Sequence, residues 1–145
     1  MTPVLVLNGP NLSRLGSREP DVYGAGTLDD LRVALDAEAT GYDIDLRQTD
    51  DEATLIGWLH EAVDAKLPVV LNPAAFTHYS YALRDAAALV TKAGLILVEV
   101  HLSNPHAREE FRHTSVISAV ATGVIAGFGF DSYLLALNLV ARRLG

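Results

Sequence analysis

The sequence contains no cysteine, which excludes disulfide bonds and thiolate chemistry and fits the reducing cytoplasm. No apolar run approaches the ~20 residues that a membrane-spanning helix requires. The N-terminus also lacks the basic segment and the apolar stretch of a secretory signal. We therefore expect a cytoplasmic protein that does not engage a membrane.

Positive charge is scarce as well, with 11 Lys and Arg residues against 18 Asp and Glu residues and a formal net charge of -7. This acidic balance argues against nucleic acid and acidic membrane surfaces as partners. An anionic ligand would have to be held locally, by individual arginines. The glycines at positions 9 and 16 match neither the Rossmann fingerprint nor the phosphate loop, which argues against nucleotide binding.

The histidines lack the spacing of a metal site. Four of them lie in the second half of the chain: His78, His101, His106 and His113. They form neither a helical His-x-x-x-His pair nor a Cys/His knuckle. We therefore expect no metal and no cofactor that contains one.

What is present is a globular composition of one domain's length. Half of the 145 residues are hydrophobic, and the chain is long enough to bury most of the surface that it exposes when unfolded. No internal repeat, low-complexity segment or interdomain linker interrupts it. We expect a single domain over residues 1–145.

Strand and helix patterns alternate along the chain. Apolar runs predict strands at residues 4–7, 69–71, 95–98 and 124–126. Residues 42–48 alternate between apolar and charged, which is typical of a half-exposed strand at a sheet edge. Helices are expected after the N-cap Thr27, after a Thr49–Glu52 capping box, and over residues 81–91 and 132–143.

Five such strand–helix units predict an α/β fold, a doubly wound parallel five-stranded sheet. The right-handed crossover rule favours the flavodoxin-like strand order 2-1-3-4-5, which places the alternating second strand at an edge.

Polar residues follow three of the predicted inner strands. Asn11 follows the first strand, Asn72 ends the third, and Glu99 and His101 end the fourth. The carboxyl ends of parallel strands share one rim, where ligands bind at the switch point of the sheet. These residues are therefore expected to converge on one site.

His101 is the clearest candidate for chemistry, although a lone histidine at a strand end is more often structural. Glu99 lies two residues earlier, so the two side chains share one face of the strand. A carboxylate behind an imidazole fixes its tautomer and raises its basicity, and such a histidine can act as a general acid near neutral pH.

The long polar loop after the first strand carries Arg18 and Tyr23. A tyrosine is a poor base at pH 7 unless a cation stabilises its phenolate, and Arg18 is the nearest candidate. Gly16 and Gly26 bracket the segment of about 16–26, which we expect to act as an active-site lid. The alternative is a tyrosine that makes only a surface contact.

These residues resemble the type II 3-dehydroquinate dehydratase family, small cofactor-free enzymes of the shikimate and quinate pathways. The resemblance covers essentially the whole chain. Its anchors are residues 8–12 (Asn-Gly-Pro-Asn-Leu), 18–24 (Arg-Glu-Pro-x-x-Tyr-Gly), Asn72, Thr77-His78, 82–86 (Ala-Leu-Arg-Asp-Ala), 99–104 (Glu-Val-His-Leu-Ser-Asn), 106–112 and 121–124.

The resemblance implies an anti elimination of water from 3-dehydroquinate, giving 3-dehydroshikimate through an enolate. It implies that Tyr23 is the base, supported by Arg18, and that His101 is the acid that protonates the departing hydroxyl. Asn11 would help to place the water or donor that stabilises the enolate oxygen, and Glu99 would orient the site from behind His101.

The resemblance also implies the substrate contacts. Asn72, His78 and Arg112 would bind the ring hydroxyls, and the backbone of Leu102 and Ser103 would bind the carboxylate. Asp85 matches a family residue that reaches into a neighbouring subunit's site, in a homo-oligomer in which trimers form a dodecamer. No lysine is among these residues, which argues against a Schiff base.

The chain departs from the commonest family pattern at Tyr79, where threonine is expected, and at Pro73-Ala74-Ala75, which replaces a more glycine-rich turn. Two alternatives remain open at this point: a non-catalytic flavodoxin-like binding module, and a homologue that keeps the pocket but not the activity. Biosynthetic and quinate-degrading roles require the same reaction.

Overall fold

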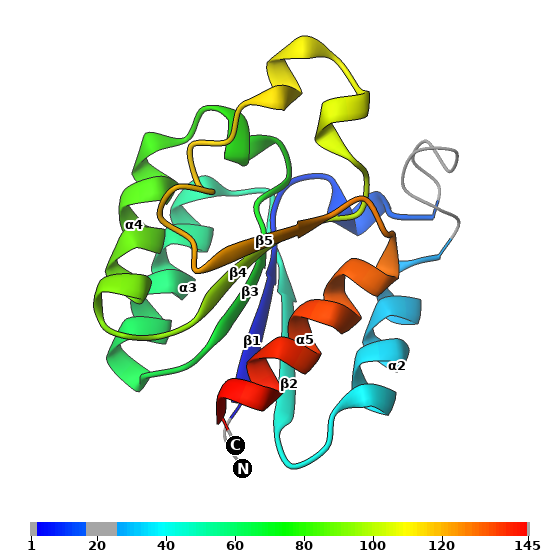
Figure 1. Cartoon of the computed structure of the whole chain (residues 1–145), viewed down its shortest axis with the longest axis vertical. Helices are drawn as coiled ribbons and strands as arrows, with labels where there is room; N and C mark the ends of the chain where they lie inside the picture. Colours follow the sequence, from blue (N-terminus) through cyan, green and yellow to red (C-terminus); the bar gives the residue numbers. More distant parts are fainter. Residues whose placement is uncertain (1–2, 17–25, 145) are drawn as a thin grey trace.

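The computed structural model describes residues 3–16 and 26–144. Five parallel strands form one sheet in the order β2-β1-β3-β4-β5, which confirms the predicted topology (Figure 1). The strands are β1 Pro3–Asn8, β2 Asp43–Gln48, β3 Val69–Asn72, β4 Leu97–His101 and β5 Gly123–Ala126.

Helices cover both faces of the sheet, as a doubly wound fold requires. Helices α2 (Leu28–Glu38) and α5 (Phe130–Leu144) lie on one face, and α3 (Glu52–Ala65) and α4 (Tyr81–Lys92) lie on the other (Figure 1). Short 3-10 turns follow the strands: η1 Leu12–Arg14, η2 Ala74–His78, η3 Pro105–Ala107 and η4 Glu110–His113.

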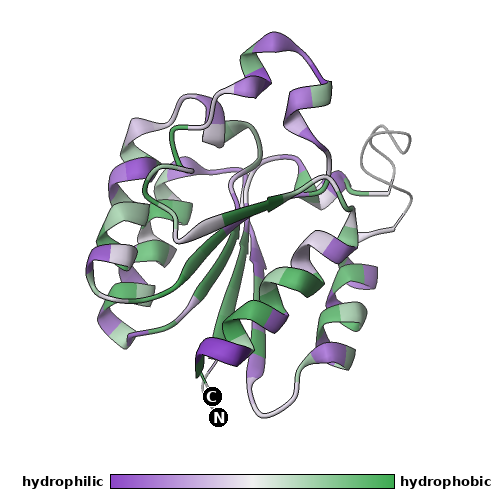
Figure 2. Cartoon of the chain, in the orientation of Figure 1, coloured by the Kyte–Doolittle hydropathy of each residue, from purple (hydrophilic) through white to green (hydrophobic). Residues whose placement is uncertain are grey.

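The hydrophobic core is divided by the sheet into two layers. Successive residues of β1 point to opposite faces, so Val4 and Val6 pack in the layer under α2 and α5 while Leu5 and Leu7 pack in the layer under α3 and α4. Figure 2 shows the apolar strands enclosed between helices whose outer surfaces are more polar. This sandwich fixes the strands whose ends carry the site.

The expected capping box of α3 is wrong. The N-cap is Asp51, whose carboxylate accepts a hydrogen bond from the Thr54 amide at 3.2 Å. The Thr49 hydroxyl instead accepts from the Asp51 amide at 3.0 Å, because Thr49 lies two residues before the N-cap. The N-cap predicted at Thr27 is confirmed, because its hydroxyl accepts from the Asp30 amide.

Strand β4 begins at Leu97, two residues later than the apolar run suggests. The Leu95 amide donates to the carbonyl of Val90 and so closes the C-terminus of α4 instead of joining the sheet. The apolar Leu95 side chain therefore packs against the core at the end of α4 and not within a strand.

Strand β2 is an edge strand, as its alternating sequence predicted. Arg47 on this strand pairs with Asp45 at 2.8 Å and with Glu61 of α3 at 2.6 Å, and its guanidinium lies over the Trp58 ring. Hydrogen bonds from Arg47 hold the pKa values of both carboxyls below their usual range.

The ends of β1 and β3 approach each other closely. The Gly9 amide donates to the Asn72 carbonyl at 2.8 Å, and a Cβ at position 9 would lie 2.6 Å from the Pro73 carbonyl oxygen. Only glycine fits this approach without a backbone shift. Within residues 3–16 and 26–144, no helix has the length and apolarity needed to cross a membrane.

Candidate active site

A cavity opens where the carboxyl ends of β1, β3 and β4 meet, at the predicted rim. Among its lining residues are six of those that the sequence singled out: Asn72, His78, His101, Leu102, Ser103 and Arg112. They come from the ends of β3 and β4 and from turns η2 and η4. The structure therefore brings together side chains that are up to 40 positions apart in the sequence.

The other predicted residues lie elsewhere. Asn11 is exposed at the start of η1, with φ of 69°, and its amide donates to Asp50 at 2.8 Å. Asp85 projects from α4, where its carboxylate is 76% exposed and pairs with Arg84. Arg18 and Tyr23 lie outside the described residues.

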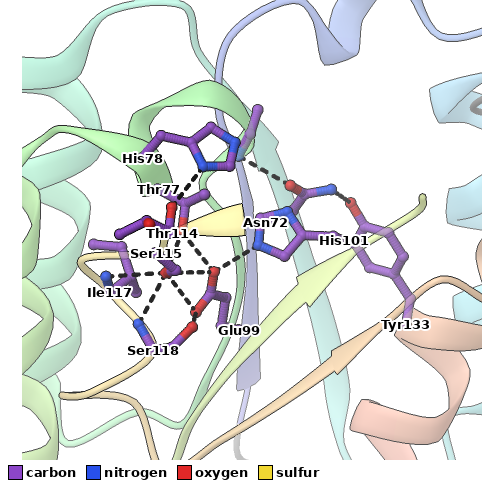
Figure 3. A network of polar contacts seen from close by, with 11 residues as sticks. Asn72, Thr77, His78, Glu99, His101, Thr114, Ser115, Ile117, Ser118 and Tyr133 are labelled. Atoms are coloured by element: carbon purple, nitrogen blue, oxygen red, sulfur yellow. Dashed lines mark hydrogen bonds and ion pairs between the residues drawn. The ribbon is translucent and has the colours of Figure 1, made fainter. Parts of the chain in front are cut away.

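Glu99 and His101 form a buried pair on β4. The Glu99 Oε2 and His101 Nε2 atoms are 2.5 Å apart, which confirms that the two side chains share one face of the strand. Glu99 is fully buried, and His101 keeps a narrow exposed edge on the cavity. Because Nε2 is bonded to Glu99, the second ring nitrogen, Nδ1, is left for a ligand (Figure 3).

Three hydroxyl groups surround Glu99 in addition to His101 (Figure 3). Thr77 Oγ1 donates to Oε2 at 2.5 Å, Ser118 Oγ donates to Oε1 at 2.6 Å, and Ser115 Oγ lies 3.1 Å from Oε2. Burial opposes ionisation of Glu99, but the bonds from His101, Ser118 and Thr77 outweigh it and hold the pKa of Glu99 below its usual value.

Sequence reasoning assigned no role to these hydroxyls. A buried glutamate does require donors, and residues 114–118 supply two of these three hydroxyls, Ser115 and Ser118. This cluster of hydroxyls in the sequence could have suggested donors for Glu99. Their distance from Glu99, however, depends on the path of the turns after β4.

The floor of the cavity is tied together by Tyr133 of α5, a residue that the sequence did not single out. Its hydroxyl donates to Asn8 Oδ1 at 2.6 Å and accepts from Asn72 Nδ2 at 2.8 Å. The Asn72 Oδ1 atom accepts from the Ala74 amide at 3.0 Å. These bonds fix which way the Asn72 amide faces, and burial raises the pKa of Tyr133 so that it remains a phenol.

His78 lies across the cavity from this floor. Its Nδ1 atom is 2.8 Å from the carbonyl of Thr114, so Nδ1 carries the proton and Nε2 is an acceptor. Desolvation, assisted by the positive charge of Arg112, lowers the pKa of His78. A neutral His78 can therefore accept a hydrogen bond from a hydroxyl group.

Two arginines supply positive charge to the cavity. Arg112 is held by Glu109 at 2.9 Å and packs on the Phe111 ring at 4.7 Å. Arg108, which the sequence did not single out, lies 3.3 Å from the Ser103 hydroxyl. Guanidinium groups of this kind suit a carboxylate or a hydroxyl.

In the described part of the chain, no three His, Asp or Glu side chains form a group that could hold a metal ion. The chemistry that the cavity offers is acid–base: a histidine with a carboxylate behind it, beside polar groups and arginines.

Comparisons with known proteins agree with this picture. The model of the dehydroquinase class II family matches residues 2–141. The chain is 60% identical over 143 residues to the 3-dehydroquinate dehydratase of Salinispora tropica, covering 97% of each sequence. It is also 60% identical over 137 residues to the one of Mycobacteroides abscessus, covering 93% of each.

Solved structures are similar over nearly the whole chain. The type II dehydroquinase from Propionibacterium acnes superposes with a TM-score of 0.93 at 50% identity, covering 98% of this chain and 97% of that one. The type II dehydroquinase from Butyrivibrio crossotus superposes with a TM-score of 0.91 at 38% identity, covering 97% of each chain.

Proposed function

Because this chain belongs to the dehydroquinase class II family and is a type II 3-dehydroquinate dehydratase, a hydro-lyase, we propose that it eliminates water by a tyrosine base and a histidine acid. The observation that carries the proposal is the Glu99–His101 pair, whose imidazole borders the cavity.

The base is assigned to Tyr23. Its phenolate removes the C2 proton beside the ketone of 3-dehydroquinate and leaves an enolate. Arg18, on the same segment of about 16–26, stabilises the phenolate and so lowers the pKa of the tyrosine. Asn11 helps to stabilise the enolate oxygen. In this proposal the segment acts as a lid over the cavity.

The acid is His101. Protonated, it donates from Nδ1 to the departing C1 hydroxyl while the enolate collapses, so that water leaves and the double bond of 3-dehydroshikimate forms. The Glu99 carboxylate at Nε2 fixes the orientation of the imidazole, so that Nδ1 is the nitrogen that delivers the proton. Tyr23 gains one proton and His101 loses one, so the elimination of water balances without a cofactor.

Asn72, His78 and Arg112 bind the ring hydroxyls. Asn72 uses one amide hydrogen on Tyr133 and one lone pair on Ala74, which leaves it a second donor and a second acceptor for substrate. The substrate carboxylate binds the backbone of Leu102 and Ser103.

The assembly and setting belong to the same proposal. Asp85 is assigned to a neighbouring subunit's site in a dodecamer of trimers, and its exposed carboxylate on α4 supports a role outside its own cavity. The enzyme works in the cytoplasm, in the shikimate or quinate pathway.

The test follows the ultraviolet absorbance of the conjugated product after protein is mixed with 3-dehydroquinate in the presence of chelator and borohydride. Wild-type protein is expected to turn over, and Tyr23→Phe and His101→Ala are each expected to lower kcat by ~10²–10⁴-fold. The exposed Tyr81→Phe and His60→Ala are matched controls. A Tyr23→Phe enzyme within a few-fold of wild type contradicts the base assignment.

A further inference from the structure

The three hydroxyls around Glu99 leave little choice about where their hydrogens point. The Ser115 Oγ atom accepts hydrogen bonds from the amides of Ile117 at 3.1 Å and Ser118 at 3.0 Å. A hydroxyl has two lone pairs and one hydrogen, so Ser115 has no lone pair left to accept a third bond. Its hydrogen must therefore go to one of its two remaining neighbours, Thr77 or Glu99.

This fixes the direction of the Thr77 hydroxyl as well. The Thr77 Oγ1 atom lies 2.7 Å from Ser115 Oγ and 2.5 Å from Glu99 Oε2. Since Ser115 cannot accept, the single hydrogen of Thr77 points at Glu99. The Ser118 hydroxyl donates to the other carboxylate oxygen at 2.6 Å. Both oxygens of Glu99 thus already accept hydrogen bonds, which favours the carboxylate over its protonated form.

We propose that Thr77, Ser115 and Ser118 are positioning residues that keep Glu99 ionised, so that Nε2 of His101 always carries a proton and Nδ1 is the nitrogen that exchanges a proton with substrate. The inference rests on the proposed role of His101 as the acid. It extends that role to three side chains that do not line the substrate cavity.

The hydroxyls line a second cavity, which adjoins the substrate cavity and shares His78, His101, Pro105 and Arg112 with it. The backbone amides of residues 117 and 118 begin a chain of donors that ends at Glu99, while His101 is the one member that reaches both cavities. Proton placement at the acid is therefore set by the turn that follows η4 (Figure 3).

Apart from Glu99, none of the described residues that line the second cavity is acidic. The titratable and charged residues that line the second cavity are, besides Glu99 and His101, His78 of η2, His106 of η3, and Arg112 and His113 of η4. Strand β5 contributes the uncharged Val124 and Ala126. Arg112 carries a positive charge that favours the carboxylate form, although its ion pair with Glu109 offsets part of that effect.

The test compares Ser118→Ala and Thr77→Val with the conservative Thr77→Ser in the full-length protein. Infrared difference spectra, with Glu99→Gln to identify the band, report the pH at which Glu99 takes a proton. Each loss of a donor is expected to raise that pH by about one unit, a ~10-fold gain in proton affinity. Thr77→Ser should keep the wild-type value.

Kinetics supply a second readout. We expect the acid limb of the kcat–pH profile to move up by about one pH unit in Ser118→Ala and Thr77→Val, in step with the altered proton affinity of Glu99. KM should stay near the wild-type value because neither side chain touches the substrate cavity. Ser132→Ala controls for the loss of a buried hydroxyl, because the Ser132 hydroxyl accepts from the Phe128 amide and is not one of the donors to Glu99. Solid-state ¹⁵N spectra of labelled histidine should show neutral His101 protonated on Nε2.

Two results would overturn the inference: an unchanged Glu99 titration in both variants, or a neutral His101 that carries its proton on Nδ1 in the wild-type protein. If Thr77→Val does not fold, the half-buried Ser118→Ala decides the matter alone. If the titrations shift as expected but wild-type protein does not turn over 3-dehydroquinate, the proposed mechanism fails while the proton arrangement stands.

Discussion

Removal of the Tyr133 hydroxyl should destabilise the protein far more than the loss of one oxygen atom suggests. Tyr133 is 1% exposed, and its hydroxyl serves both Asn8 and Asn72, which are 0% and 3% exposed. In Tyr133→Phe the Asn8 Oδ1 atom loses its donor and one hydrogen of Asn72 Nδ2 loses its acceptor.

Each buried polar group left without a partner costs about 1–3 kcal/mol, so the two together should lower the free energy of unfolding by about 2–6 kcal/mol. That is a large share of the ~5–15 kcal/mol that stabilises a typical domain. Tyr81→Phe is the matched control, because Tyr81 is 71% exposed and its change should stay within about 0.5 kcal/mol.

Urea denaturation followed by circular dichroism would measure both variants at one protein concentration, because any association between copies would make the midpoint depend on concentration. A Tyr133→Phe protein as stable as Tyr81→Phe would refute the reasoning, and would mean that the two asparagines find other partners or admit water. Substrate affinity is expected to weaken in parallel, because the Asn72 amide loses the bond that sets its orientation.

Three further perturbations test other parts of the structure. Gly9→Ala should lower the free energy of unfolding by about 1–3 kcal/mol in urea denaturation, because the new Cβ would lie 2.6 Å from the Pro73 carbonyl oxygen; an unchanged value would show that the turn moves freely. Ala74→Gly should raise the melting temperature, with a gain of up to about 1 kcal/mol, because Ala74 has φ of 52°, a conformation that costs nothing for glycine; a lower melting temperature would contradict this. The folded-state pKa of Glu99 is lowered, so ionised Glu99 stabilises the fold above the ordinary value of 4.5, and this contribution is lost as pH falls through the folded pKa. The free energy of unfolding measured against pH in acid should therefore change less steeply in Glu99→Gln than in wild type. Equal slopes in the two proteins would count against this reasoning.

The fold could be predicted from the sequence because its signals are local. Each inner strand is an apolar run, β2 alternates in polarity, and the crossover rule then orders the five strands. The gathering of Asn72 and His101 at one rim followed from topology alone, since parallel strands end at the same edge.

The details that could not be predicted depend on contacts between distant residues or on small differences in geometry. Tyr133 meets Asn8 across 125 positions, and nothing in the periodicity of α5 distinguishes that tyrosine from other apolar residues on its buried face. The N-cap of α3 was misplaced because Thr49 and Asp51 are both good caps, and the choice depends on where the chain turns into the helix.

The ion pairs on β2 also bear on aggregation. An edge strand exposes unpaired backbone groups, which can template pairing with another molecule. Charged side chains on such an edge discourage this pairing, and here Arg47 holds its charge in place through Asp45 and Glu61. Because Arg47 also lowers the pKa values of both carboxyls, the edge keeps its charges in acid that would neutralise ordinary aspartate and glutamate. Concentrated solutions should therefore resist strand-to-strand association at this edge even at mildly acidic pH.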